Sequence, residues 1–195
     1  MALVVDKLIP EFEAEATGGI KVSNTTHLDQ MLVLFFYPKD NTPGCTTEAL
    51  QFRDKYKDFV KAGAVVYGVS RDNMASHDAF KEKLELPYEL IADTEEKMCH
   101  MFGVVKNKIM YGKKVKGISR STFLVGPDGV LRKEWRGVKV ENHVAEVLKA
   151  AICWVESAAS WLAESAVTWV LVRAAISVVV KAASCVAGKV ASRLA

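Results

Sequence analysis

The junction between one apolar run and the helical pattern that follows it restricts the fold of this chain most. The run Met31–Phe36 (MLVLFF) predicts a buried β-strand, and the polar–apolar pattern of Pro43–Lys61 predicts a helix. Thr42 is a favourable N-cap, and Pro43 suits the first helical position because its missing N–H would be unpaired there. The chain therefore passes from a buried strand into a helix through a short polar connection.

Cys45 lies in the first turn of this predicted helix. Free backbone N–H groups and the positive end of the helix dipole favour a thiolate at that position. A thiol with a pKa near 8.5 is only about 3% ionised at pH 7, whereas a pKa near 6 gives about 90%. Cys45 is therefore a candidate nucleophile, and its alternative is an inert buried cysteine.

Strand and helix patterns alternate along the chain as far as residue 150. Strands are expected at Leu32–Tyr37, Ala64–Ser70, Glu89–Ala92, Ser121–Val125 and Val130–Trp135. Helices are expected at Pro43–Lys61, Ala75–Leu84, Glu95–Phe102 and from Glu141 onward. Alternation of this kind that ends in a hairpin predicts an α/β fold with a central mixed sheet flanked by helices.

Two further segments carry local signals. Pro127-Asp128-Gly129, between the last two predicted strands, favours a tight hairpin turn. Residues 103–120 are basic and contain glycine without a clear period, so a long loop or irregular ribbon is expected there.

The bulk composition excludes several classes of protein. A chain of 195 residues forms one domain, or one domain with an extension, and its formal charge of +3 is too small and too evenly spread for nucleic-acid binding. No signal peptide is visible. The four histidines are scattered, and the cysteines lie far apart without a C-x-x-C motif, so we expect no metal site, no disulfide framework and a reducing cytoplasmic setting. The cysteines are Cys45, Cys99, Cys153 and Cys185.

The spacing P-x-x-x-T-x-x-C of Pro38, Thr42 and Cys45 resembles the active-site signature of peroxiredoxins. Over roughly residues 4–150 the chain resembles the bacterioferritin-comigratory, or peroxiredoxin Q, branch of that family. The matching segments are FFYPKDNTPGCTTEA at 35–49, FRDKY at 52–56, YGVSRD at 67–72, MYGKKVKGISRSTFLVGPDG at 110–129 and WRGVKVENH at 135–143. The resemblance implies a thioredoxin-like fold and a thiol-dependent peroxidase without a bound cofactor.

The implied reaction is attack of the Cys45 thiolate on hydrogen peroxide or an organic hydroperoxide, which leaves a sulfenic acid. Ionisation of the thiol does not account for a fast reaction, so donors must also stabilise the breaking O–O bond. The resemblance assigns a guanidinium donor to Arg120, and Thr42 is the candidate hydroxyl donor. The expected substrate pocket consists of Pro38, Pro43 and Gly44.

Each of these roles has a structural alternative. Thr42 also fits a plain N-cap, Pro43 a residue that only sets geometry, and Arg120 one half of a surface ion pair. Glu48, one turn after Cys45, resembles a family position, and its alternative is an ordinary solvated helix carboxylate. A hydrolase built from Cys45 and a histidine is disfavoured, since nothing near the histidines resembles such a family.

The resolving thiol is where the chain departs from many relatives. Leu50 and Lys81 stand where those relatives carry a second cysteine. Cys99, within the predicted helix Glu95–Phe102, is the candidate resolving cysteine, and its alternative is a half-buried helix cysteine. We expect a one-cysteine mechanism in which glutathione, thioredoxin or another external thiol reduces the sulfenic acid.

Residues 151–195 lie beyond the resemblance, so the expected division is a peroxiredoxin domain at 1–150 and an apolar helical extension at 151–195. An apolar seam with 4-3 spacing runs from Val144 to Val190, which predicts a coiled coil or a helical hairpin. We expect a homo-oligomer first and interfacial membrane contact second. A membrane span is disfavoured because it needs about 20 apolar residues. The alternative function is an assembly or membrane-tethering protein that acts through this tail, and a terminus without an evolved role is a further alternative.

Overall fold

The computed structural model of the chain describes residues 3–25, 27, 30–110 and 113–157. The chain divides into two compact units, Met1–Ile152 and Cys153–Ala195. Residues 153–157 of the second unit are helical, and the predicted seam beyond them lies outside the described residues. In the described part of the chain, no helix has the length and apolar character that crossing a membrane requires.

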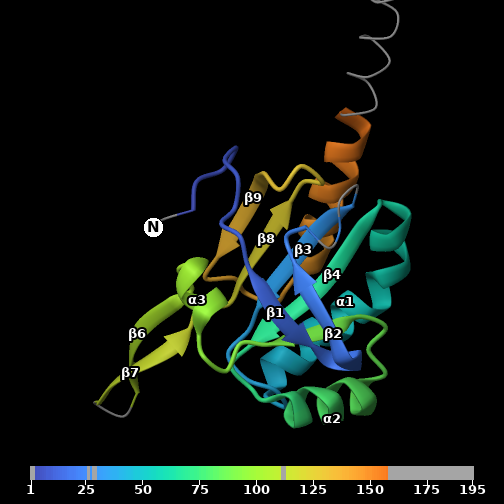
Figure 1. Cartoon of the computed structure of the whole chain (residues 1–195). Coiled ribbons are helices and arrows are strands. Elements are labelled where there is room, and N and C mark those ends of the chain that lie inside the picture. Colours follow the sequence, from blue (N-terminus) through green and yellow to red (C-terminus); the bar gives the residue numbers. More distant parts are fainter. Residues whose placement is uncertain (1–2, 26, 28–29, 111–112, 158–195) are drawn as a thin grey trace, which may run out of the picture. The chain divides into compact units, whose positions relative to one another are not determined.

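A seven-stranded mixed sheet forms the centre of the first unit, in the order β2-β1-β5-β4-β3-β8-β9 (Figure 1). Its middle consists of three parallel strands, β3 (Met31–Phe36), β4 (Ala64–Ser70) and β5 (Glu89–Ala92). Every residue of β3 is buried, as expected of a strand covered on both faces. The predicted α/β architecture with a mixed sheet is confirmed.

Antiparallel strands extend the sheet on both sides. β8 (Ser121–Val125) pairs with β3, and β9 (Leu131–Arg136) pairs with β8 after the predicted turn, in which Gly129 has a φ of +74°. At the opposite edge, β1 (Glu13–Ala16) pairs with β5, and β2 (Ile20–Ser23) pairs with β1. A single 3-10 turn, Thr17–Gly19, separates β1 from β2.

Helices supply the connections that parallel neighbours need. α1 (Pro43–Lys61) joins β3 to β4 with the predicted bounds, and α2 (Met74–Leu84) joins β4 to β5 and begins one residue earlier than predicted. α3 (Lys97–Met101) is shorter than predicted because Glu96, with a φ of +58°, cannot begin a helix. A further helix occupies residues 143–157 of the described chain.

The expectation of a long loop or irregular ribbon at residues 103–120 is wrong. Most of this segment forms a regular antiparallel hairpin, β6 (Val105–Met110) and β7 (Lys113–Ile118), which projects from the sheet (Figure 1). Lysines interrupt the apolar alternation that normally reveals a strand. β1 and β2 were likewise not predicted, because each has only four residues and includes charged side chains.

Aromatic side chains fill the core on both faces of the sheet. Phe35 of β3 stacks on Phe52 of α1, with ring centroids 4.4 Å apart. Phe36, its neighbour on β3, points to the opposite face and packs at 5.1 Å against Phe102, which follows α3. This alternation is the period-2 geometry of a strand. Because β3 is covered on both faces, the point where it ends is firmly fixed.

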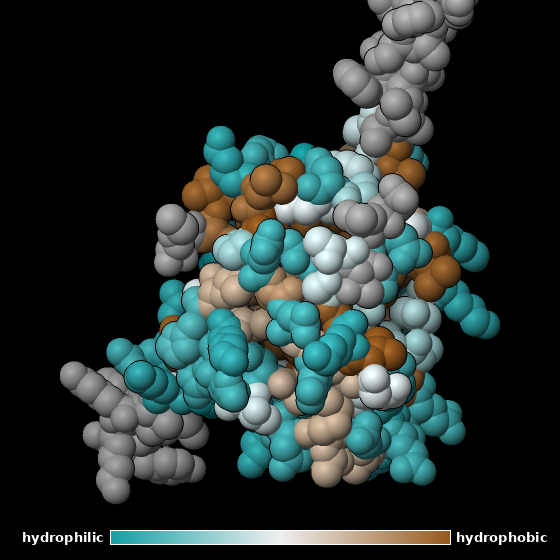
Figure 2. Space-filling model, viewed as in Figure 1, coloured by the Kyte–Doolittle hydropathy of each residue, from teal (hydrophilic) through white to brown (hydrophobic). Residues whose placement is uncertain are grey.

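The outer surface of the face shown in Figure 2 is mostly hydrophilic, with hydrophobic residues gathered where Figure 1 shows the N-terminal segment beside β9. Val4, Val5 and Leu8 are exposed in this segment. The segment is tied to β9 through the backbone, since the N–H of Asp6 donates to the carbonyl of Leu131 at 2.8 Å.

We predict that Phe52→Ala lowers the free energy of unfolding by about 3–5 kcal/mol, because it empties a fully buried ring site against Phe35. The matched control is Val60→Ala on the same helix, where the side chain is 54% exposed and the loss should be within about 0.5 kcal/mol. Urea unfolding measures both. Equal losses in the two variants would contradict this assignment of the core.

Candidate active site

Cys45 occupies the first turn of α1, directly after the connection from β3. Pro43 lies at the first helical position, as predicted, and Thr42 is the N-cap residue with extended backbone angles of −89° and 146°. The Cys45 side chain is buried, with 2% exposed. The sulfur is thus placed among the unpaired N–H groups of a helix start, which favour negative charge.

Arg120 contacts this sulfur. Its Nη2 donates to Cys45 Sγ at 3.2 Å, and its Nη1 pairs with Glu48. The register of the sheet explains the contact between Arg120 and Cys45, because Ser121 at the start of β8 lies opposite Phe36 at the end of β3. Arg120 precedes Ser121, so it stands beside the point where the chain leaves β3 for Cys45. The surface ion pair considered for Arg120 does not describe this partly buried group.

Glu48 is fully buried, so its alternative as a solvated helix carboxylate is wrong. Burial raises its pKa to about 7, although the charge and hydrogen bond of Arg120 act in the opposite direction. Within the described part of the chain, Oε1 of Glu48 has no hydrogen-bond partner, whereas Oε2 holds Arg120. One carboxyl oxygen therefore fixes the guanidinium that faces the sulfur.

Thr42 does not cap the helix with its side chain. Its hydroxyl donates to the carbonyl of Lys39 at 3.0 Å, and no capping hydrogen bond forms. Because its proton is directed to Lys39, the Thr42 hydroxyl is not available as the expected donor in this arrangement, and its oxygen keeps its lone pairs to accept a hydrogen bond.

The remaining residues of the expected pocket are Pro38, in the connection after β3, and Pro43 and Gly44, the first two residues of α1. Pro38 is half-buried, whereas Pro43 and Gly44 are exposed. A Cβ at Gly44 would lie 3.4 Å from Nη2 of Arg120. The missing side chain of Gly44 therefore leaves space beside the guanidinium.

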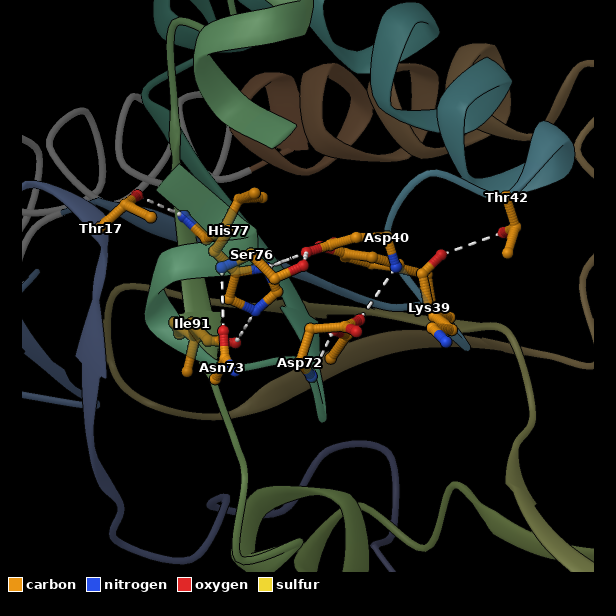
Figure 3. Close-up of polar contacts among 12 residues, drawn as sticks. Thr17, Lys39, Asp40, Thr42, Asp72, Asn73, Ser76, His77 and Ile91 are labelled. Carbon is orange, nitrogen blue, oxygen red and sulfur yellow. Dashed lines mark hydrogen bonds and ion pairs between the residues drawn. The ribbon is translucent and has the colours of Figure 1, made fainter. Parts of the chain in front are cut away.

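A buried network that nothing in the sequence pattern indicates holds the connection before Cys45 (Figure 3). Asp40 accepts hydrogen bonds from Tyr37 at 2.7 Å and from Ser76 at 2.8 Å, and it lies 2.9 Å from Nδ1 of His77. These partners come from β3's end and from α2. His77, one of the scattered histidines, thus has its partner 37 residues earlier in the chain.

Cys99 is fully buried rather than half-buried. Burial raises the pKa of its thiol, and the neighbouring Asp93 carboxylate raises it further. The backbone N–H of Cys99 donates to Asp93 at 2.7 Å. Cys45 and Cys99 are both free thiols, Cys153 is exposed, and Cys185 lies outside the described residues.

Among the residues the structure describes, no group of histidine, cysteine and acidic side chains is arranged to hold a metal.

The positions of the two missing cysteines have structural roles of their own. Lys81 of α2 forms an ion pair with Glu89 of β5, and Leu50 is half-buried on α1. Glu89 also accepts a hydrogen bond from the Thr17 hydroxyl. The Lys81–Glu89 ion pair attaches α2 to the sheet.

Comparison with known proteins identifies the family of the chain. Residues 5–134 match the AhpC/TSA family. Peroxiredoxin Bcp of Bacillus subtilis is 46% identical over 149 residues, which cover 76% of this chain and 95% of the relative. Peroxiredoxin Bcp of Xanthomonas campestris is 48% identical over 134 residues, which cover 69% of this chain and 84% of the relative.

Solved structures give the same result. A structure of Xanthomonas campestris bacterioferritin comigratory protein, determined to study its alkyl peroxide reduction activity, shares 44% identity with this chain and a TM-score of 0.71. The match covers 74% of this chain and 92% of that protein. None of these comparisons supports an assembly or membrane-tethering function. The chain belongs to the AhpC/TSA family and is a peroxiredoxin, a thiol-dependent peroxidase with a thioredoxin-like fold.

Proposed function

We propose that Cys45 is the peroxidatic residue, that Arg120 and Thr42 orient the substrate, and that the protein reduces hydrogen peroxide and small organic hydroperoxides in the cytoplasm. The observation that carries the proposal is the contact of 3.2 Å between Arg120 and the Cys45 sulfur at a helix start. A guanidinium and unpaired N–H groups at one sulfur stabilise its thiolate. They also remain available for charge that develops during the reaction.

The thiolate attacks the terminal oxygen of the hydroperoxide. The S–O bond forms while the O–O bond breaks, and the leaving hydroxide or alkoxide takes a proton from solvent to give water or an alcohol. Cys45 becomes a sulfenic acid. Arg120 stabilises the negative charge as it moves from sulfur to the leaving oxygen, and the free lone pairs of Thr42 accept the hydrogen of the attacked O–H.

Access to the site fits small organic hydroperoxides as well as hydrogen peroxide. Pro43 and Gly44 are exposed at the helix start, and Gly44 leaves space beside Arg120. The alkyl peroxide reduction activity named for the Xanthomonas campestris relative supports the same substrate class.

An external thiol reduces the sulfenic acid. The fully buried Cys99 has a raised pKa, which makes it a poor nucleophile, and Leu50 and Lys81 supply no thiol. A thiol such as glutathione or thioredoxin displaces water from the sulfenic acid to form a mixed disulfide, and a second thiol releases Cys45. No bound cofactor and no nucleic acid enter this cycle. Self-association or membrane contact through the tail stays a prediction for residues outside the described part.

Treating the reduced protein with one equivalent of hydrogen peroxide tests the assignment of Cys45. We expect one added oxygen, or a dimedone adduct, confined to Cys45 by intact mass and peptide mapping. Cys45→Ser should abolish the reaction, whereas the matched variant Cys99→Ser should keep the wild-type rate within about twofold, because Cys99 takes no part. A disulfide between Cys45 and Cys99 would overturn the one-cysteine mechanism and leave the peroxidase assignment intact.

We predict that Arg120→Gln lowers the second-order rate constant for hydrogen peroxide by about a hundredfold, as loss of one preorganised charged donor does in other enzymes. Arg120→Lys keeps the charge but cannot contact Cys45 and Glu48 together, so its rate should lie in between. Stopped-flow measurement of Cys45 oxidation gives both values. A wild-type rate in Arg120→Gln would exclude Arg120 from the reaction.

Replacing Glu48 with glutamine tests the cost of ionising this buried carboxyl. Its folded pKa of about 7 lies above the ordinary 4.5, so its contribution to stability is full below the lower value and is lost as the pH rises through the higher one. Relative to Glu48→Gln, the wild-type protein should lose up to about 3 kcal/mol of unfolding free energy between roughly pH 5 and pH 8. Urea unfolding of both proteins measures this difference. A wild-type advantage at the higher pH would show that Arg120 more than offsets burial.

A further inference from the structure

The connection between β3 and the helix that carries Cys45 is held mainly by α2 and the end of β4, elements on one side of it (Figure 3). Arg120 approaches Cys45 from β8, on the other side of β3. The helix start therefore lies between two attachments that come from opposite sides. The position of the Cys45 sulfur relative to the Arg120 guanidinium depends on both attachments.

The carboxylate of Asp40 is the centre of the α2 attachment. It is 4% exposed, and both of its oxygens are engaged: Oδ1 accepts from Tyr37, and Oδ2 accepts from Ser76 and faces Nδ1 of His77. Burial by itself raises the pKa of Asp40, but the hydrogen bond and charge of His77, together with Tyr37 and Ser76, lower it below the ordinary value. Asp40 is thus held as a buried carboxylate.

His77 is fully buried, and both of its ring nitrogens face acceptors. Nδ1 lies 2.9 Å from Oδ2 of Asp40, and Nε2 lies 3.2 Å from the carbonyl oxygen of Ile91 on β5. His77 therefore joins the connection to both α2 and β5.

The backbone of the connection is attached as well. The N–H of Asp40 donates to Asp72 at 2.9 Å, and the hydroxyl of Ser70, the last residue of β4, donates to the same carboxylate oxygen at 2.7 Å. The next residue, Asn41, has a φ of +56° and accepts a hydrogen bond from Lys83 of α2 at 3.1 Å. A non-glycine residue keeps such a conformation when its surroundings hold it there.

We propose that Asp40 and His77 are positioning residues for Cys45: their buried pair fixes the connection so that the first turn of α1 presents the sulfur to Arg120. The proposal rests on the proposed function of Cys45. Neither residue touches the sulfur in the contacts described here, so their effect passes through the backbone to Thr42. Misplacement of a reacting group by about 1 Å is enough to lower a rate by about a hundredfold.

Two substitutions of His77 separate positioning from packing. His77→Asn places an amide nitrogen near Nδ1 and keeps a donor to Asp40, whereas His77→Gln places it near Nε2 and keeps only the bond to Ile91. We expect His77→Asn to retain the rate constant of Cys45 oxidation by hydrogen peroxide within about threefold and His77→Gln to lose about tenfold or more. Asp40→Asn, which removes the carboxylate, should resemble His77→Gln.

Thr17, in the 3-10 turn between β1 and β2, provides a matched control, because its substitution removes a buried hydrogen bond away from Asp40 and His77. The Thr17 hydroxyl donates to Glu89 and accepts from the N–H of Leu90 at 3.0 Å, so Thr17→Val should lower the thermal midpoint without changing the peroxide rate. Alkylation of Cys45 by iodoacetamide is measured in parallel. This reaction needs no alignment with Arg120, so the ratio of the peroxide to the alkylation rate should fall in His77→Gln and Asp40→Asn.

The outcomes are distinct. Equal loss of the peroxide rate in His77→Asn and His77→Gln, or a wild-type rate in His77→Gln and Asp40→Asn with circular dichroism showing folded protein, overturns the positioning role. Failure of Cys45 in the wild-type protein to react with peroxide overturns the proposed function instead. The wild-type reaction is therefore measured before any variant is compared.

Discussion

The contact between the Arg120 guanidinium and the Cys45 sulfur is the interaction on which the rest of the site depends. It exists because β8 pairs with β3, and this register places Arg120 beside the end of the strand that leads to Cys45. The aromatic core on both faces of β3 keeps that end in place. The sheet thus brings a guanidinium to a sulfur that already lies at a helix start, and the proposed role of Cys45 rests on this combination.

Burial of charge is the second constraint. Glu48 holds Arg120 from within the core, and the Asp40–His77 pair holds the connection from the other side. Both pairs lie in the interior, where a carboxyl group costs free energy unless hydrogen bonds or nearby charges compensate it. Such a pair fixes the geometry of the site, because two buried side chains have few alternative arrangements. The site therefore combines a buried sulfur with supports that are themselves buried.

Local signals predicted much of the fold and part of the site. The bounds of α1 follow from Thr42, Pro43 and the amphipathic pattern, and the turn at Gly129 follows from its residue types. The β6–β7 hairpin was not predicted because lysines obscure its alternation. Glu48 was ambiguous, since a carboxylate on a helix has the same sequence signature whether it is solvated or buried. His77 had no local signal, because its partner Asp40 lies 37 residues away.

Local signals place a cysteine in the first turn of a helix that follows a buried strand, since caps, proline positions and apolar runs act over a few neighbouring residues. The sequence also carried the resemblance that pointed to Arg120. The groups around that cysteine come from distant parts of the chain, and tertiary packing brings them together. Strand register brought Arg120 to Cys45, and the packing of α2 on the sheet brought His77 to Asp40. Burial raised the pKa values of Glu48 and Cys99. Contacts between residues far apart in the chain depend on how whole elements pack, and no local pattern encodes them.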